Sequence, residues 1–369
     1  MTLSRIYAGA VLAAAAAIAA PEATASTSAH AAARKRPRPA AESTAANFAG
    51  REDVQRYAHD VAERGGLPLP WVLEQLREAR GVAAVRRLIM PPPAGTAKNW
   101  RSYRAIFVER ERIANGVAFW RTHERWLQAA SERWGVPPEI VVSILGVETY
   151  YGRIAGGFRV LDALATLAFD FPPGRKDRSA FFRDELESLL QIAYREGLPA
   201  ASFRGSYAGA IGLPQFMPSS IQRWAIDFDD DGHIDLRNNP ADAIGSVAHY
   251  LASFGWQRGL PTHYDVAVPV DTADRAALLA PDIVPSFSPA QFVERGALLP
   301  DAALAHDGPL ALVELQNGPA APTYLAGTSN FYTITRYNWS SYYAMAVIEL
   351  AEALRRAGVT AEATPAARR

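Results

Sequence analysis

Residues 136–152 read VPPEIVVSILGVETYYG and carry the clearest structural signal in the chain. Two prolines, followed by Glu139 at the positive end of the helix dipole, predict that a helix begins here. The residues that follow are mostly apolar, and the run ends at two tyrosines and Gly152. The stretch therefore predicts a short, buried helix that stops near Tyr150.

Glu148 lies near the end of this predicted helix, where local stability does not explain a carboxylate. It follows Leu145, Ile144 and Val141 at spacings of three, four and seven residues, so it projects from the apolar face. The negative end of the helix dipole also disfavours a charge there. Burial and the dipole both favour the protonated carboxyl, which a general acid needs near neutral pH. The alternative is a structural glutamate buried against an arginine such as Arg153.

Five segments of the sequence carry a family resemblance. They are residues 146–153 (GVETYYGR), 161–167 (LDALATL), 205–210 (GSYAGA), 215–220 (QFMPSS) and 334–338 (ITRYN). Together, and in this order, they resemble the membrane-bound lytic transglycosylase B family over about residues 99–351. The resemblance implies a mainly α fold with a goose-lysozyme-like catalytic core.

The resemblance also implies a reaction. Members of this family cleave the β-1,4 bond between N-acetylmuramic acid and N-acetylglucosamine in peptidoglycan and leave a 1,6-anhydromuramoyl end. The position that matches their single catalytic acid and base is Glu148. Most glycosidases use two carboxyl groups, and no second catalytic acid is apparent in the matched motifs. One group can serve twice, first as the acid and then as the base.

Further positions match residues that line the sugar-binding groove of the family. The implied substrate-binding residues are Tyr103, Arg178, Ser206, Gln215, Phe216, Tyr337, Asn338 and Tyr343. Aromatic rings, amides and hydroxyls suit sugars, which present apolar ring faces and directional hydroxyls. Taken singly, each of these residues could equally be ordinary packing. Around Arg178 the loop departs in length from the family pattern.

Residues 227–235 read DFDDDGHID and have the spacing of a calcium-binding loop. Acidic residues occupy positions 1, 3, 5 and 9, and glycine occupies position 6. Position 12 is Asn238 rather than glutamate, so Asp242 is the candidate for the closing ligand. The predicted ligands of a structural Ca²⁺ are Asp227, Asp229, Asp231, the His233 carbonyl, Asp235 and Asp242. The alternative is a solvated acidic turn without a metal.

Composition and periodicity divide the chain into regions. An apolar, alanine-rich run that is shorter than the roughly 20 residues of a spanning helix predicts a signal peptide. Helical periodicity follows, and a Pro- and Ala-rich region with strand-like runs at 264–270 and 310–315 predicts a small β-containing insertion. The predicted regions are a signal peptide (1–28), a disordered linker (29–46), an N-terminal helical region (47–135), the catalytic core (136–260 and 325–356), the insertion (261–324) and a disordered tail (357–369).

The overall composition excludes several classes of protein. Thirty-eight basic and 38 acidic side chains balance, so no strong net charge favours nucleic acid as a partner. There is no cysteine, and the seven histidines form no zinc motif with a central glutamate. No phosphate-binding or dinucleotide-binding motif occurs, so no organic cofactor is expected. The signal pattern predicts a periplasmic or secreted protein without a stable membrane anchor.

Two alternatives to a lytic transglycosylase stay open from the sequence. One is a hydrolytic muramidase of the same fold, in which water is the nucleophile. The other is a noncatalytic peptidoglycan-binding protein that keeps the groove. In each case the expected partners are peptidoglycan glycan strands, with cell-wall synthesis proteins as further candidates.

Overall fold

The computed structural model describes residues 48–91 and 98–362 and divides them into two compact units. Unit 1 holds residues 98–157 and 210–362 of the described chain, and unit 2 holds residues 48–91 and 158–209. The predicted signal peptide and linker lie outside the described residues. The division differs from the predicted one, because the helices of residues 47–135 are split between the units.

Unit 2 is helical and contains a two-stranded antiparallel sheet in which Phe158 pairs with Gly205. Helix α1 buries Val54, Tyr57 and Val61, as the periodicity predicts. The elements are α1 (Glu52–Gly65), α2 (Leu69–Arg77), α3 (Ala83–Leu88), β1 (Phe158–Arg159), α8 (Val160–Phe169), α9 (Ser179–Arg195), the 3-10 helix η1 (Ala200–Ser202) and β2 (Arg204–Gly205).

Two polar residues of α8 explain part of the 161–167 motif. The carboxylate of Asp162 accepts a hydrogen bond from the backbone N–H of Arg80 at 3.0 Å, and the Thr166 hydroxyl accepts one from Val82 at 2.9 Å. Both side chains are buried. They satisfy backbone donors of the segment between α2 and α3, so this part of the motif stabilises unit 2.

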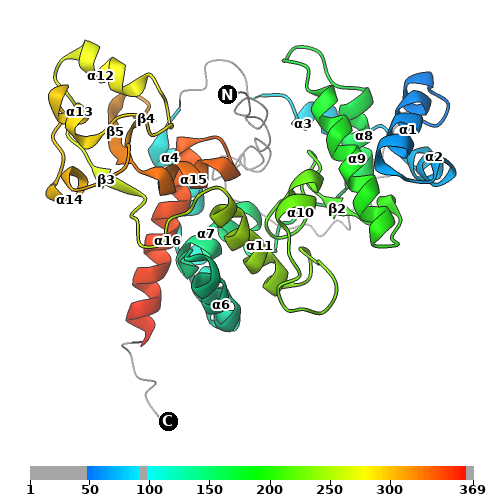
Figure 1. The fold of residues 1–369 in the computed structure, drawn as a ribbon, viewed down its shortest axis with the longest axis horizontal. Coiled ribbons are helices and arrows are strands. Elements are labelled where there is room, and N and C mark those ends of the chain that lie inside the picture. The colour runs from blue at the N-terminus through cyan, green and yellow to red at the C-terminus, as the bar shows by residue number, and fades with distance from the viewer. Residues whose placement is uncertain (1–47, 92–97, 363–369) are drawn as a thin grey trace, which may run out of the picture. The chain divides into compact units, whose positions relative to one another are not determined.

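Unit 1 is built around α7, which is buried on all sides from Ile140 to Thr149. Helices α5, α6, α11 and α16 pack against it, and the long α16 runs beside it in Figure 1. The helices of this unit outside the insertion are α4 (Trp100–Phe107), α5 (Arg110–Thr122), α6 (Glu124–Trp134), α7 (Pro138–Thr149), α10 (Pro218–Trp224), α11 (Pro240–Ser253), α15 (Ser329–Tyr337) and α16 (Ser341–Glu362).

The last helix is longer than the sequence predicts. Helix α16 continues to Glu362, past residue 357, where the sequence predicts the start of a disordered tail. Good helix formers such as Ala and Glu in this stretch allow the helix to continue. Residues 363–369 lie outside the described chain.

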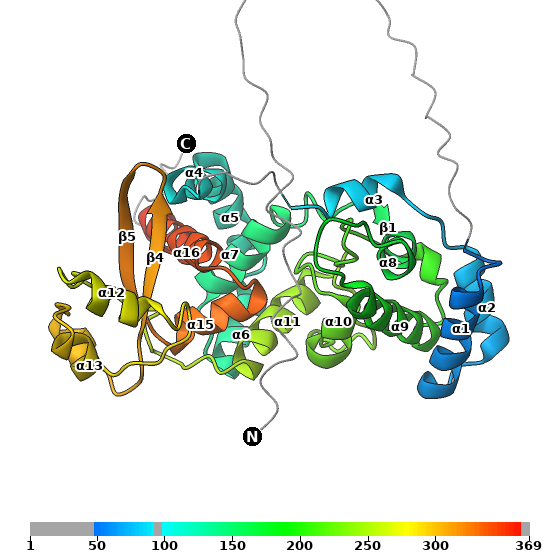
Figure 2. The same ribbon diagram turned by 90° about the horizontal axis from the view of Figure 1, so that it is seen from above.

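The insertion has a small sheet and a core of its own. The sheet is antiparallel with strand order β3-β5-β4, and Figure 2 shows the β4–β5 hairpin with α12 and α13 beside it. The elements are β3 (His263–Asp265), α12 (Thr272–Leu279), α13 (Pro289–Glu294), α14 (Asp301–Leu304), β4 (Ala311–Asn317) and β5 (Ala320–Gly327). The core comprises Leu278, Phe292, Ala297, Leu310, Leu312 and Ala326.

The insertion also corrects a predicted strand. The alternating pattern at 264–270 predicts a strand over its full length, but β3 ends at Asp265. Ala267 instead forms an isolated bridge with Leu298, and Pro269, which has no N–H, follows soon after. The run at 310–315 forms most of β4, as predicted.

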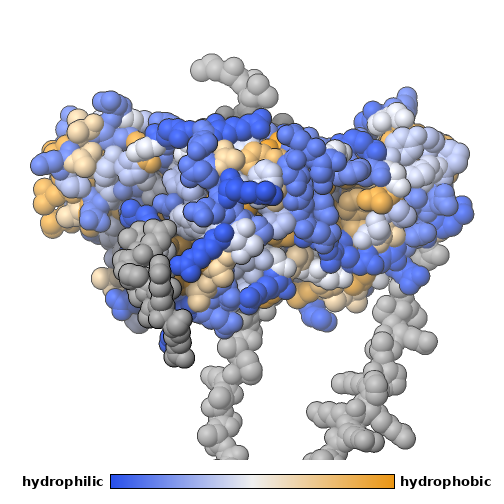
Figure 3. Space-filling model, turned by 90° about the horizontal axis from the view of Figure 1, so that it is seen from below, coloured by the Kyte–Doolittle hydropathy of each residue, from blue (hydrophilic) through white to orange (hydrophobic). Residues whose placement is uncertain are grey.

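In residues 48–91 and 98–362, none of the helices combines the length and apolarity needed to cross a bilayer. On the face shown in Figure 3, hydrophobic side chains occur in separate groups among hydrophilic ones.

Candidate active site

Glu148 is a buried carboxyl in the last turn of α7, with 7% of its surface exposed. Its Oε1 accepts a hydrogen bond from the Tyr343 hydroxyl at 2.7 Å, and its Oε2 has no hydrogen-bond partner among residues 48–91 and 98–362. Burial raises the pKa of Glu148 to about 7, although the Tyr343 hydrogen bond opposes the shift. A carboxyl with this pKa can donate a proton near neutral pH and take one back afterwards.

The structure does not support the interpretation of Glu148 as half of an ion pair. In the described part of the chain no salt bridge involves Glu148. The suggested partner, Arg153, has its guanidinium carbon 5.6 Å from the centre of the Tyr150 ring.

Tyrosines surround the carboxyl of Glu148. Tyr343 on α16 stacks on Tyr337 at the end of α15, with 6.3 Å between ring centres and 11° between ring planes. The Tyr337 hydroxyl donates to the Pro214 carbonyl at 2.5 Å. Tyr103 on α4 is half-buried, and burial together with the charge of Glu148 raises its pKa. These predicted residues therefore lie around the acid.

Tyr250, on α11, belongs to the same cluster although the sequence did not point to it. Its ring centre lies 5.0 Å from that of Tyr337 and 5.5 Å from that of Phe216. Its hydroxyl donates to the Arg336 carbonyl at 2.6 Å. Tyr250 follows Val247 by three residues on the apolar face of α11, so from sequence it resembles an ordinary core residue.

An unusual helix end holds Glu148 in place. Directly after α7, Tyr150 and Tyr151 both have left-handed backbone conformations, with φ of 54° and 60°. Such conformations are rare outside glycine and need support from their surroundings. The Tyr151 ring lies against Gly146, where a Cβ atom would come within 2.8 Å of the ring. A larger residue at position 146 would therefore displace this tyrosine.

One face of α5 supplies that support. The Arg112 guanidinium donates to the Gly146 carbonyl at 2.5 Å and lies 4.5 Å from the centre of the Tyr150 ring. Asn115 donates to the Tyr150 hydroxyl at 3.0 Å, and the Tyr151 hydroxyl donates to the Arg112 carbonyl at 3.0 Å. These residues are three apart on α5, so they face the end of α7 together.

Other predicted groove residues of unit 1 are mostly buried. The Gln215 amide donates to the Gly212 carbonyl at 2.9 Å, in a turn where Gln215 itself has a φ of 52°. Phe216 packs on Tyr337, with 5.8 Å between ring centres. The buried Asn338 joins α15 to α16 in an extended conformation. Their predicted contacts with sugars stay predictions.

The other two predicted substrate-binding residues, Ser206 and Arg178, belong to unit 2. The Ser206 hydroxyl accepts a hydrogen bond from the Ala208 backbone N–H at 3.3 Å. The guanidinium carbon of Arg178 lies 4.5 Å from the centre of the Phe181 ring. Burial and the nearby charge of Arg175 lower the pKa of Arg178. The roles of both residues in binding stay predictions.

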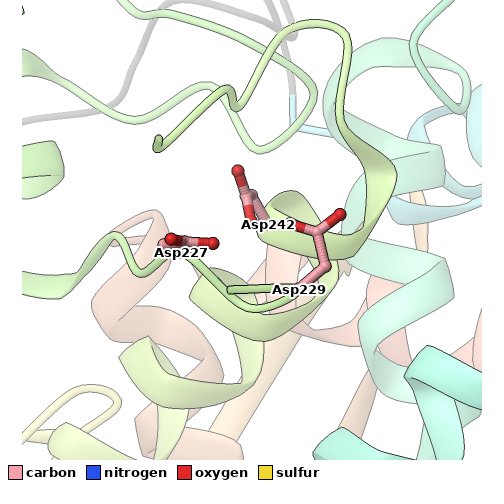
Figure 4. Close-up of side chains that lie close together, drawn as sticks. All are labelled: Asp227, Asp229 and Asp242. Carbon is pink, nitrogen blue, oxygen red and sulfur yellow. The ribbon is translucent and has the colours of Figure 1, made fainter. Parts of the chain in front are cut away.

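An acidic cluster forms where the sequence predicts a calcium loop. Carboxylate oxygens of Asp227, Asp229 and Asp242 lie within 4.8 Å of one another. Figure 4 shows the first two on the loop and Asp242 on α11. We refer to these three residues as the acidic cluster. Three carboxylates this close repel one another, and a hard cation would offset that repulsion.

Asp242 holds the two ends of the acidic loop together. Its fully buried carboxylate accepts hydrogen bonds from the backbone N–H groups of Phe228 and Asp235, each at 2.8 Å. Burial, and secondarily the charges of Asp229 and Asp227, raise the pKa of this carboxyl.

The remaining predicted ligands lie outside the acidic cluster. The carboxylate of Asp231 accepts from the His233 backbone N–H at 2.9 Å. Asp235 accepts from the backbone of Arg237 and Asn238 at 2.9 and 3.0 Å, so its side chain stabilises the following turn. Loop spacing did not reveal this local hydrogen bonding, which acidic side chains often form in turns.

Residues 49–352 match a family model described as "Transglycosylase SLT domain". The chain belongs to this transglycosylase family. It is 39% identical over 321 residues to the membrane-bound lytic murein transglycosylase B of Escherichia coli (strain K12), and the match covers 85% of each chain. The family resemblance read from the sequence motifs is thus confirmed.

Solved structures of transglycosylases share the fold. The soluble lytic transglycosylase SltB1 of Pseudomonas aeruginosa is 38% identical, with a TM-score of 0.75, covering 83% of this chain and 99% of that one. The Escherichia coli lytic transglycosylase SLT35, solved in complex with calcium, is 37% identical, with a TM-score of 0.72, covering 85% and 95%. The predicted fold class, a mainly α lysozyme-like core with a small β-containing part, is confirmed.

Proposed function

We propose that this lytic transglycosylase cleaves the β-1,4 bond between N-acetylmuramic acid and N-acetylglucosamine in peptidoglycan, with Glu148 as its only acid and base. The observation that carries the proposal is the carboxyl of Glu148, which is buried, has a pKa of about 7 and leaves Oε2 without a partner in the part of the chain that the structure describes. Family membership supports the reaction type.

The reaction needs one carboxyl group used twice. Protonated Glu148 donates its proton through Oε2 to the glycosidic oxygen, and the bond to the anomeric carbon breaks. The acetamido group of the substrate stabilises the positive charge on that carbon. The Glu148 carboxylate then takes the proton of the sugar's 6-hydroxyl, whose oxygen attacks the anomeric carbon. The product is a 1,6-anhydro ring, and Glu148 is protonated again.

Tyr343 stabilises the intermediate state of Glu148. Its hydroxyl donates to Oε1, so the hydrogen bond strengthens when Glu148 becomes negative after the first proton transfer. Tyr343 therefore lowers the cost of a buried negative charge and fixes the carboxyl with Oε2 available. Tyr103 contributes a further half-buried ring beside the acid.

The acidic cluster is the best candidate for a structural calcium site. Oxygen ligands in a loop closed by a buried aspartate match the preference of Ca²⁺. Asp227, Asp229 and Asp242 would hold the ion, with the His233 carbonyl and the other acids of the loop as further candidates. The predicted signal peptide would place the enzyme in the periplasm or outside the cell, where peptidoglycan and calcium are both available.

Mass spectrometry of the products tests the reaction type. Purified peptidoglycan is digested with the wild-type protein and with Glu148→Gln, and the muramic acid ends are analysed. The proposal predicts 1,6-anhydro ends from the wild type and none from the variant. Reducing ends would instead show a hydrolytic muramidase, and binding without cleavage by the wild type would show a noncatalytic protein.

A further inference from the structure

A row of aromatic rings in tilted and edge-to-face contacts, with an arginine among them, lies in unit 1, next to the site of Glu148. We call Trp224, Phe254, Tyr332, Arg336 and Trp339 the aromatic band. The Arg336 guanidinium carbon lies 5.2, 5.8 and 5.5 Å from the ring centres of Phe254, Tyr332 and Trp339. Trp224 continues the row, with 5.0 Å between its ring centre and that of Phe254.

The band reaches the surface at Trp339, which is 41% exposed, while its other members are half-buried. Tyr332 and Arg336 are four residues apart on α15, so they project from one side of this helix, and Trp339 follows the end of the helix. Tyr332 contacts Trp339 edge to face at 5.9 Å. Tyr332 and Arg336 restrict the Trp339 side chain, so little conformational entropy is lost when a ligand stacks on it.

The charge of the band is positive. Arg336 forms no ion pair with a carboxylate within the described ranges of the chain, and its NH1 group donates to the Tyr332 hydroxyl at 3.4 Å. At the other end, the Arg223 guanidinium carbon lies 5.9 Å from the centre of the Trp224 ring. The Arg336 guanidinium, held among aromatic rings, keeps donors for carboxylates. The band therefore suits a ligand with apolar ring faces and negative groups.

Ring contacts connect the band to the active site. Trp224 contacts Tyr250 at 4.9 Å between ring centres, and Tyr250 contacts Tyr337 at 5.0 Å. Tyr337 stacks on Tyr343, whose hydroxyl donates a hydrogen bond to Glu148. The band is thus the outer end of a continuous series of rings that begins at the acid.

We propose that the aromatic band is a second binding surface for the peptidoglycan strand, outside the groove in which the bond is cut. Sugar rings stack on Trp339 and Tyr332, while Arg336 pairs with carboxylates of the stem peptides. This inference rests on the proposed function, because the strand must be the substrate. It predicts that the enzyme holds long polymers more tightly than short fragments.

Binding to intact peptidoglycan in the inactive Glu148→Gln protein tests the proposal without any cleavage. Sedimentation with purified sacculi gives the dissociation constant of that protein and of the same protein with Trp339→Ala. We expect binding to weaken by about tenfold, the effect of losing one good aromatic contact. Tyr194→Ala is the matched control, because Tyr194 is 45% exposed and contacts Trp71 edge to face in unit 2. Thermal melting checks that each variant is folded.

Two further measurements separate the contribution of Arg336 to binding stem peptides from that of Trp339 to binding sugar rings. Arg336→Gln should weaken binding to intact sacculi but leave binding to glycan strands stripped of their peptides by an amidase unchanged. In the active enzyme, Trp339→Ala should raise KM for sacculi and leave turnover of a short soluble muropeptide unchanged.

Equal binding by Trp339→Ala and Tyr194→Ala would overturn the proposal. If the wild type released no product from sacculi, the proposed function would fail instead, and the binding assay would still report on the band.

Discussion

The site of Glu148 and the acidic cluster place the same chemical group in two different environments. Glu148 lies among tyrosines, accepts one hydrogen bond at Oε1 and, within the described ranges, has no partner at Oε2. In the acidic cluster three carboxylates lie within 4.8 Å, and Asp242 accepts two backbone hydrogen bonds. Both Glu148 and Asp242 are buried.

The difference shows that burial alone does not decide what a carboxyl group does. With the Tyr343 hydroxyl as its one donor, burial favours the neutral form of Glu148, which is the form that the proposed proton donor needs. In the acidic cluster, backbone N–H groups donate to Asp242, and a cation could bind between the three carboxylates and stabilise their charged forms. Four predictions test this contrast, from the largest expected effect to the smallest.

Glu148→Gln should abolish most of the activity. Glutamine has nearly the same shape but cannot donate or accept the proton, so turnover should fall on the order of 10³-fold, within the range for general acid and base catalysis. The measurement is the rate of release of soluble muropeptides. Glu139→Gln is the control, since Glu139 lies in the first turn of the same helix. Similar losses from both substitutions would contradict a special role for Glu148.

The same substitution should make the folded protein more stable at high pH. Between the ordinary pKa of 4.5 and the native pKa of about 7, the unfolded chain loses the proton of Glu148 while the folded chain keeps it. Raising the pH in this window therefore lowers the free energy of unfolding of the wild type by up to about 3 kcal/mol. The variant lacks this carboxyl and does not show the effect.

Denaturant unfolding at about pH 5 and about pH 8 measures this effect. Glu148→Gln should gain stability relative to the wild type as the pH rises, and the gain should level off above about pH 7. A constant difference across this range would mean that the native pKa of Glu148 is ordinary.

Calcium should stabilise the wild type through the acidic cluster. At a concentration about a hundred times its Kd, an ion that binds only the folded state adds about 2.7 kcal/mol to the free energy of unfolding. Asp229→Asn should remove most of this gain in melting experiments with calcium or with a chelator. Asp271→Asn, at the N-cap of α12, should keep it. An equal response in both variants would place the ion elsewhere.

Tyr343→Phe should have the smallest effect. Loss of one hydrogen bond to a charged group should lower kcat about tenfold. Because this hydrogen bond lowers the pKa of Glu148, its removal should move the alkaline limb of the pH–rate profile to higher pH. Tyr342→Phe is the control, because that hydroxyl contacts the backbone of Gln316 instead. A limb that stays in place would show that Tyr343 does not act on Glu148.

Much of the fold and the burial of Glu148 could be predicted from the sequence. The prolines and Glu139 predicted where α7 begins, and helical spacing predicted that Glu148 is buried. These features are local, so a single sequence shows them. The acidic loop was found in the same way, and Asp242 accepts hydrogen bonds from its backbone. Calcium binding by this loop stays a prediction.

Long-range contacts could not be predicted. Arg112 and Asn115 form hydrogen bonds with the end of α7, over thirty positions further along the chain. The sequence of α5 does not predict these contacts. Asp235, whose ligand role stays a prediction, also accepts hydrogen bonds from the following turn, and spacing does not show which donors a side chain meets. The split of the N-terminal helices between two units likewise depends on packing partners far along the chain.

The proposal that Glu148 is the acid is tested most directly by measuring its protonation state in the folded protein. Infrared difference spectra of the wild type against Glu148→Gln isolate the carboxyl stretching band of this one residue as the pH is raised. The account predicts a protonated carboxyl at about pH 6 that ionises with a midpoint near 7. A carboxylate band already complete at about pH 5 would contradict it, because the group could not then act as the acid.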